Sequence, residues 1–257
     1  MKNSSDNRFE TASDSRFDAR FDSDFATSLL IDIAQERSLD GLMETLMGVC
    51  TTLPEFARVE FWLIEKGDIC SRCPQRAQCP DQTRCLHLVA GCDNPVPGSG
   101  REASIFYHSH ERIPLGVGII GRTGMTGKQA EMQDLDKDLG ELSSTESRRL
   151  LTRLKSPLLG KDLGELSGIE WLRSEQTRGF AVTPISFRDE ILGAIALFTR
   201  INAPKEGRVW RQIFADHIGA AIVNARAFEE IHRLKSQLEM QNAYLQEEVV
   251  EAKAFGE

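Results

Sequence analysis

Four cysteines lie close together between two segments that have the composition of β-strands. The strand-like segments are Arg58–Glu65 and Cys85–Ala90, and the part that connects them carries the C-x2-C-x5-C-x5-C spacing of Cys70, Cys73, Cys79 and Cys85. Short runs rich in aliphatic and aromatic residues predict paired strands. We therefore expect a cysteine-rich hairpin over residues 68–92, in which the four thiols are held close together.

The setting of these thiols indicates a metal site rather than disulfides. The first residues, Met1–Asn7, lack the apolar stretch of a signal peptide, and no apolar run is long enough to span a bilayer. We therefore expect a cytoplasmic protein without membrane contact, in a compartment where thiols stay reduced. The net charge of −8 argues against direct contact with nucleic acid, which usually needs a basic face.

Two metal chemistries fit the loop, and we predict an iron–sulfur cluster rather than zinc. Iron–sulfur clusters take four thiolates, often from one compact loop with a proline after a cysteine, and Pro74 and Pro80 each follow a cysteine here. The strongest zinc pattern has two C-x2-C pairs, whereas this loop has one. A structural Zn²⁺ site and metal-free thiols are the alternatives. His87 and Cys92 are candidates for extra ligands or resolving groups.

Helical periodicity precedes the hairpin. Residues 1–23 are polar and acidic and predict a disordered arm. Apolar residues then recur at three- and four-residue steps from Asp24, and again from about Leu39 to Leu53, where Pro54 ends the pattern. Cys50 lies on this second helix, where we expect a small buried thiol.

The second half of the chain predicts another pair of strands and a long helix. Gly179–Ser186 and Glu190–Thr199 have the composition of paired strands, and a helical pattern begins at about Lys205. Before these strands, residues 136–168 are polar and contain Lys-Asp-Leu-Gly-Glu-Leu-Ser twice. Since a single repeated pair is too short for a solenoid, we expect a polar surface insertion there.

A glycine-rich segment, Gly116–Gly121, matches the dinucleotide-binding pattern G-x-G-x-x-G. That pattern binds a dinucleotide where it joins a central strand to a helix. Here the polar residues His108–Arg112 and Pro114 precede it, without a long apolar strand. We therefore do not expect a nucleotide site.

The C-terminal part of the long helix carries a coiled-coil pattern. Alternating three- and four-residue steps place one stripe of apolar residues on the helix, namely Ile231, Leu234, Leu238 and Leu245. Gln241 interrupts the stripe at a core-type position, which costs stability but can fix the register of a dimer. Because a lone helix of this kind is marginally stable in water, we expect residues 229–257 to form a homodimer.

Residues 24–228 resemble a GAF domain, a sensing domain of many bacterial regulators. Three regions in this order carry the resemblance, namely Arg112–Arg122, Thr183–Ser186 with Leu192–Phe198, and Phe214–Arg226. The resemblance implies an α+β fold with a six-stranded antiparallel sheet and helices on one face. It also implies a pocket for a small-molecule effector between the sheet and residues 112–127, lined by apolar groups such as Ile119 and Phe180.

The tail from Phe228 to Glu248 resembles the signalling helix of bacterial enhancer-binding proteins, which activate the alternative sigma factor. The formate hydrogenlyase activator and the alternative nitrogenase activators belong to that group. In such proteins the helix leads into an AAA+ ATPase domain, which the resemblance implies as a partner. No Walker motif occurs in this sequence. Typical members have a plain turn in place of the cysteine loop, so the resemblance does not identify its ligand.

These observations lead to one main hypothesis and one alternative. The main hypothesis is a sensory regulatory module of a transcriptional activator, which responds to redox state, a gas or a small molecule through the metal centre and the pocket. The alternative is a stand-alone, dimeric, small-molecule-binding GAF protein with structural zinc. We expect no enzyme, because the sequence contains no H-E-x-x-H motif, no Ser/His/Asp set and no paired carboxylates at a motif spacing.

Overall fold

The computed structural model describes residues 23–79, 81–135, 170–202 and 205–254. The predicted acidic arm therefore lies almost wholly outside the described residues. The predicted polar insertion, with both copies of its repeated sequence, lies outside them as well.

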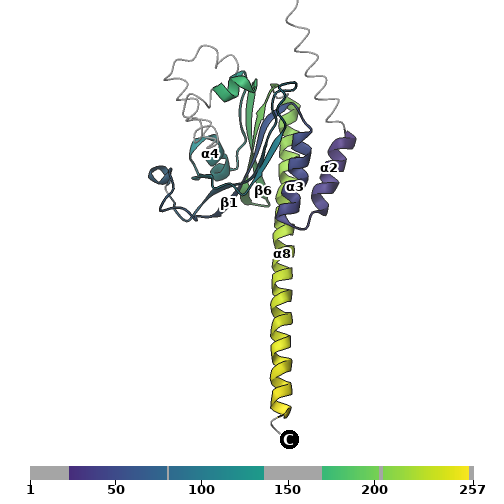
Figure 1. The fold of residues 1–257 in the computed structure, drawn as a ribbon. Coiled ribbons are helices and arrows are strands. Elements are labelled where there is room, and N and C mark those ends of the chain that lie inside the picture. Colours follow the sequence, from purple (N-terminus) through teal and green to yellow (C-terminus); the bar gives the residue numbers. More distant parts are fainter. Residues whose placement is uncertain (1–22, 80, 136–169, 203–204, 255–257) are drawn as a thin grey trace, which may run out of the picture.

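An antiparallel sheet forms the centre of the molecule (Figure 1). The described strands are β1 (Phe56–Lys66), β2 (Arg84–Asp93), β3 (Ser104–Tyr107), β4 (Arg112–Ile113), β5 (Ala130–Met132), β6 (Gly179–Phe187) and β7 (Glu190–Thr199). They run in the order β3-β2-β1-β7-β6-β5, and β4 pairs with β2 beside β3. The β1–β2 and β6–β7 hairpins confirm the strand pairs predicted from the sequence.

Helices cover both faces of this sheet (Figure 1). On one face lie α2 (Ser23–Gln35), α3 (Leu39–Thr51) and the first part of α8 (Lys205–Ala254). On the other face lies α4 (Gly118–Thr126). An α+β fold with an antiparallel sheet, flanking helices and a long C-terminal helix is therefore confirmed.

Two details implied by the resemblance are wrong. The sheet has seven described strands rather than six, because β3 and β4 pair with different parts of β2. Helices are also not confined to one face, because the face under α4 is apolar too and needs cover from water. β2 also continues beyond the predicted strand end at Ala90, since Cys92 pairs with Val59 and with Ile105.

Apolar side chains form a separate cluster on each face of the sheet. Neighbouring residues of β1 enter different clusters, with Leu63 facing the helical layer of α2, α3 and α8 and Trp62 facing α4. Successive side chains of a strand point to opposite faces, so a strand covered on both sides reads as one apolar run. The sequence Phe61–Ile64 is such a run.

Helix α8 approaches the sheet closely at one glycine. A Cβ atom at Gly219 would lie 2.2 Å from the carbonyl oxygen of Ser186 on β6. Ile218 and Ile222 on the same part of α8 are buried in the core. The glycine therefore lets the helix backbone pack directly on the strand.

The second half of α8 extends beyond the domain (Figure 1). Near the point of exit, Arg226 pairs with Glu65, and the Glu229 carboxylate accepts a hydrogen bond of 3.1 Å from the Leu39 backbone N–H. Beyond it, Ile231 and Leu238 are each 59% exposed. The described residues include no helix that is both long enough and apolar enough to cross a membrane.

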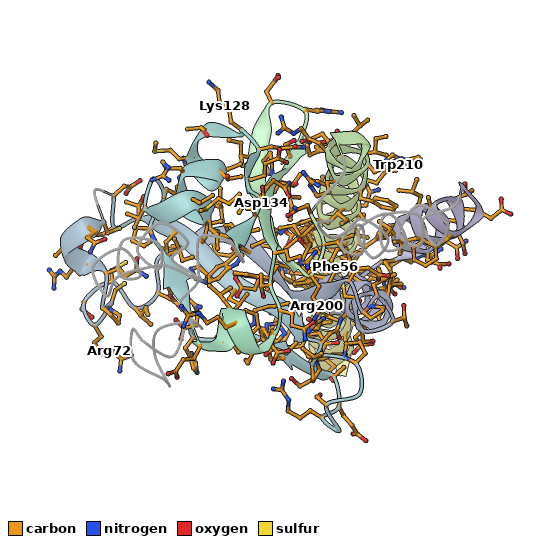
Figure 2. All side chains as sticks on the ribbon, turned by 90° about the horizontal axis from the view of Figure 1, so that it is seen from above. Phe56, Arg72, Lys128, Asp134, Arg200 and Trp210 are labelled. Atoms are coloured by element: carbon orange, nitrogen blue, oxygen red, sulfur yellow. The ribbon has the colours of Figure 1, made fainter. Side chains whose placement is uncertain are left out.

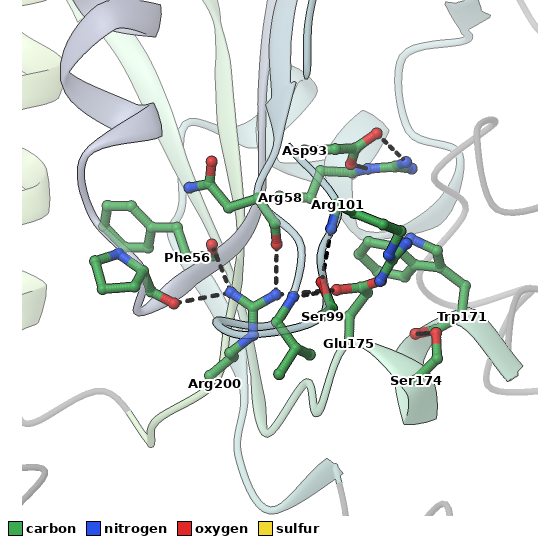
Figure 3. Close-up of polar contacts among 12 residues, drawn as sticks. Phe56, Arg58, Asp93, Ser99, Arg101, Trp171, Ser174, Glu175 and Arg200 are labelled. Atoms are coloured by element: carbon green, nitrogen blue, oxygen red, sulfur yellow. Dashed lines mark hydrogen bonds and ion pairs between the residues drawn. The ribbon is translucent and has the colours of Figure 1, made fainter. Parts of the chain in front are cut away.

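A buried ionic cluster joins the strand ends near the start of β1 (Figure 3). Arg200, which follows β7, donates to the carbonyl oxygens of Pro54 at 2.8 Å and Phe56 at 3.0 Å. It also pairs with the Glu175 carboxylate at 3.0 Å, and that carboxylate accepts from the Val96 N–H at 3.1 Å. These contacts tie β1, β7 and the segment after β2 together.

Candidate functional site

The predicted cysteine loop connects β1 to β2 and projects from the sheet on the side away from α2 and α3 (Figure 1). A hydrogen bond of 2.8 Å from the Gly67 N–H to the Thr83 carbonyl closes its base. Within the loop, Arg76–Gln78 form a short 3-10 turn. Arg72, in the outer part of the cysteine loop, lies far from Trp210, which is on the opposite side of the domain (Figure 2).

The structure brings the four predicted ligands to one small cavity. Cys70, Cys73 and Cys79 come from the loop and Cys85 from the start of β2, and all four line the same cavity of about 10 Å³. Arg76, Arg84 and Arg112 line it as well. Their guanidinium groups can offset the negative charge that thiolate ligands bring to a metal centre.

In the described arrangement the thiols point partly toward backbone acceptors. The Cys70 Sγ donates to the Gln82 carbonyl and the Cys79 Sγ to the Asp81 carbonyl, each at 3.0 Å. Among the described residues, no three His, Cys, Asp or Glu side chains are already placed to hold a metal ion together. The thiols must therefore rotate toward the shared cavity to bind one. A Cys-ligated metal provides roughly 10 kcal/mol or more, enough for this change.

Burial affects the protonation of two of the thiols. It raises the pKa of Cys85 to about 11 and also raises the pKa of Cys79. Because the thiolate is the ligand, a metal that binds these side chains must displace their protons. The set of four closely spaced sulfur donors fits zinc or an iron–sulfur cluster by its chemistry.

An ion pair anchors the loop to the rest of the sheet. Arg112 of β4 donates to Asp68 through Nε at 3.0 Å and through a terminal nitrogen at 2.7 Å. Its hydrogen bonds hold the pKa of the Asp68 carboxyl well below its usual range. The Gln75 side chain donates to the Arg112 carbonyl at 3.3 Å. Two parts of the loop are therefore fixed to the same residue of β4.

His87 lies beside this ion pair rather than in the cavity. Its Nε2 is 3.7 Å from an Asp68 carboxylate oxygen, and burial lowers its pKa. The residues that line the cavity of the four cysteines do not include it. Ligation by His87 stays a prediction.

The interpretation of Cys92 as an extra ligand is corrected by the structure. β2 runs on to Asp93, and Cys92 lies seven residues beyond Cys85, a separation of roughly 23 Å along a strand. Cys92 is buried against Cys50 of α3, and a hydrogen bond between the two thiols, with burial, raises the pKa of Cys50. Asn94 fixes this arrangement by donating to the Cys50 carbonyl at 2.8 Å.

Ile119 and Phe180 both lie in the apolar cluster under α4. Ile119 is 6% exposed and Phe180 is 1% exposed. A ligand pocket beside them stays a prediction. A cavity of about 180 Å³ lies on the other face of the sheet, under α3 and α8, and its residues Thr183, Trp210 and Arg211 were not recognised from the sequence.

Comparisons with known proteins give similarities of fold. No protein-family profile matches the chain, and no curated protein matches it. Solved structures similar to it include the GAF domain of the phosphoenolpyruvate-protein phosphotransferase from Acinetobacter. The two sequences are 13% identical, and the TM-score is 0.49. The similarity covers 79% of this chain and 93% of that one. The corresponding GAF domain from Coxiella burnetii has 15% identity, 79% and 92% coverage and a TM-score of 0.47.

The similar structures also include enzymes. Free methionine-R-sulfoxide reductase from Neisseria meningitidis, in complex with its substrate, has 14% identity, 79% coverage of this chain, 88% coverage of its own and a TM-score of 0.43. None of these three similarities reaches a TM-score of 0.5, and no site residue is inferred from them.

Proposed function

We propose that this chain is the sensory and signal-transmitting module of a bacterial transcriptional activator. In this proposal Cys70, Cys73, Cys79 and Cys85 hold a metal centre that responds to redox state or a gas. The observation that carries it is the arrangement of the four thiols around one cavity, in a loop anchored to β4. The sequence resemblance to the sensor domains of enhancer-binding proteins supports it. The proposal assigns no reaction to the chain.

The residues around the cavity have distinct parts in this proposal. The four cysteines are the ligands, and the neighbouring arginines offset their charge. Asp68 and Arg112 hold the loop against β4, so that a change in the loop reaches the sheet. An iron–sulfur cluster, when bound, supplies sensitivity to oxygen or nitric oxide, because exposed clusters change or lose iron in their presence.

The proposed output is the pairing of the C-terminal helices in a homodimer. β2 lies directly beside β1, and Glu65 near the end of β1 pairs with Arg226 of α8. The cysteine loop is therefore connected to the exit point of α8 by one strand. Beyond this point an apolar stripe of α8 is exposed, which fits a helical partner. An AAA+ ATPase domain joined to this helix would receive the signal.

One observation favours the alternative of structural zinc. The cavity of about 10 Å³ is close to the size that one water molecule needs, so it suits a single ion better than a cluster. A cluster would require the loop to widen around it. Zinc has no redox chemistry, so it would stabilise the loop without sensing.

Metal analysis with absorption spectroscopy tests the proposal. The full chain, purified without oxygen, is expected to contain iron and sulfide, with broad visible absorption that bleaches in air. Cys73→Ser should lose this absorption and the metal, whereas Cys50→Ser, which changes a cysteine outside the loop, should keep both. Colourless protein with one zinc per chain would select the alternative, and protein without stoichiometric metal would refute both.

A further inference from the structure

The 180 Å³ cavity lies between the sheet and the helical layer. β1, β6 and β7 form its floor, and α3 and α8 form its walls. Phe56 and Trp210, which both line it, lie on the side of the domain away from Arg72 of the cysteine loop (Figure 2). It is therefore separate from the metal site, and it lies on the opposite face of the sheet from Ile119 and Phe180.

The size of the cavity restricts what can bind. An engineered apolar cavity of about 150 Å³ holds benzene, whereas pockets for drug-sized ligands start at about 300 Å³. The present cavity of about 180 Å³ lies between these values. Most of its lining is apolar, with Phe61, Phe214 and Trp210 among the side chains. These properties fit a ligand with one aromatic ring.

A buried hydroxyl marks one polar point of the cavity. Thr183 lines it from β6 and is 2% exposed, and its Oγ1 has no hydrogen-bond partner within the described part of the chain. Buried polar groups are normally hydrogen-bonded, and each exception needs an explanation. A ligand with a hydrogen-bond acceptor would supply the missing partner.

Arg211 adds positive charge to the same cavity. It lines the cavity from α8, and a terminal nitrogen donates to Glu131 at 2.9 Å. Its Nε, also buried, has no hydrogen-bond partner among the residues described. Arg208 pairs with the same Glu131 carboxylate, so two guanidinium groups share one carboxylate. Among the described side chains, this carboxylate therefore faces an excess of positive charge, which favours an anionic ligand group.

We propose that this cavity binds a small aromatic carboxylate. The ring would occupy the apolar part beside Trp210 and Phe214, and the carboxylate would accept hydrogen bonds from the Thr183 hydroxyl and the Arg211 Nε–H. The proposal goes beyond the metal-sensing function, and it does not depend on the cysteine loop. Because Trp210, Arg211 and Phe214 belong to α8, an occupied cavity would alter the packing of that helix.

Titration of benzoate into the full chain, followed by calorimetry and by tryptophan fluorescence, tests the proposal. Saturable binding at one site per chain is expected. Thr183→Val keeps the shape but removes the hydroxyl, and it should weaken binding roughly tenfold. Thr177→Val is the matched control, because Thr177 is 1% exposed and also has an unpartnered hydroxyl but does not line the cavity. It should leave the affinity unchanged.

A second variant tests the location of the site. Ala181→Leu adds volume to the floor of the cavity and should abolish binding, while circular dichroism shows that the fold is kept. Cys73→Ser should bind benzoate as the unchanged chain does, which separates this proposal from the proposed metal function. Absence of saturable binding to the unchanged chain would overturn the proposal. Binding that neither Thr183→Val nor Ala181→Leu weakens would also overturn it.

Discussion

At the scale of single residues, the site depends on contacts that bring side chains of distant segments together. Arg112 fixes the cysteine loop through Asp68 and Gln75, and Glu175 fixes the strand ends through Arg200. The sequence shows which residues can ligate metal, because ligand type and spacing are local properties. It does not show these partners, since they lie from 25 to 44 positions apart.

Gly67 is expected to be required for metal retention. A Cβ atom there would lie 2.5 Å from the Cys70 Sγ and 2.9 Å from the Gln82 carbonyl oxygen. Gly67→Ala should therefore displace Cys70 and lower the metal content of the purified protein by at least half. Gly48→Ala is the matched control, because nothing lies within 4 Å of the added methyl group. Equal metal content in both variants would contradict the described loop.

Glu175 is expected to contribute strongly to stability. Its side chain is 3% exposed and pairs with Arg200, whose side chain is 9% exposed. Glu175→Ala leaves a buried guanidinium without its carboxylate, which should lower the free energy of unfolding by about 3 kcal/mol. Urea denaturation measures this loss. Glu190→Ala removes an exposed carboxylate and should change stability by less than about 0.5 kcal/mol. A similar loss in both variants would argue against a special effect of the buried pair.

At the scale of elements, the sequence predicts local structure well and packing less well. Their runs of apolar and β-branched residues made β6 and β7 recognisable, and the three- and four-residue steps revealed α3 and α8. The pairing of β4 with β2 was missed because two residues, Arg112 and Ile113, carry no detectable period. The cavity under α8 was missed because it depends on how far a helix stands from a sheet.

Gly219 is expected to set the distance between α8 and β6. Gly219→Val would place a side chain against the Ser186 backbone, where the Cβ atom alone already lies 2.2 Å from the carbonyl oxygen. Because backbone cannot move aside easily, we expect a loss of about 3 kcal/mol in the free energy of unfolding. Asn224→Val adds a β-branched residue at an exposed position of the same helix and should cost under about 1 kcal/mol. Equal costs would indicate that the contact is loose.

At the scale of the whole molecule, the cysteine loop and the exposed part of α8 extend from one domain in different directions (Figure 1). The sheet lies between them, with a helical layer on one face and α4 on the other. A signal that begins at the loop can reach α8 through the end of β1, which lies next to the loop. The path from β1 through the Glu65–Arg226 pair is short and consists of described contacts.

The exposed stripe of α8 is expected to be the dimer interface. Leu234 is 45% exposed and Leu238 is 59% exposed, and both lie on the predicted coiled-coil stripe. Leu234→Asp combined with Leu238→Asp should give monomers with a folded domain, as measured by light scattering and circular dichroism. Ser236→Asp combined with Met240→Asp adds the same charge on another face of the helix and should stay dimeric. A double Leu→Asp variant that remains dimeric would place the interface elsewhere.

X-ray absorption spectroscopy of the full chain, purified without oxygen, tests the central claim most directly. The account predicts stoichiometric iron or zinc in which each metal atom has four sulfur neighbours, since Cys70, Cys73, Cys79 and Cys85 are the ligands. Serine substitution of any one of them should lower the number of sulfur neighbours or remove the metal. Protein without bound metal, or metal surrounded mainly by nitrogen and oxygen, would contradict the account.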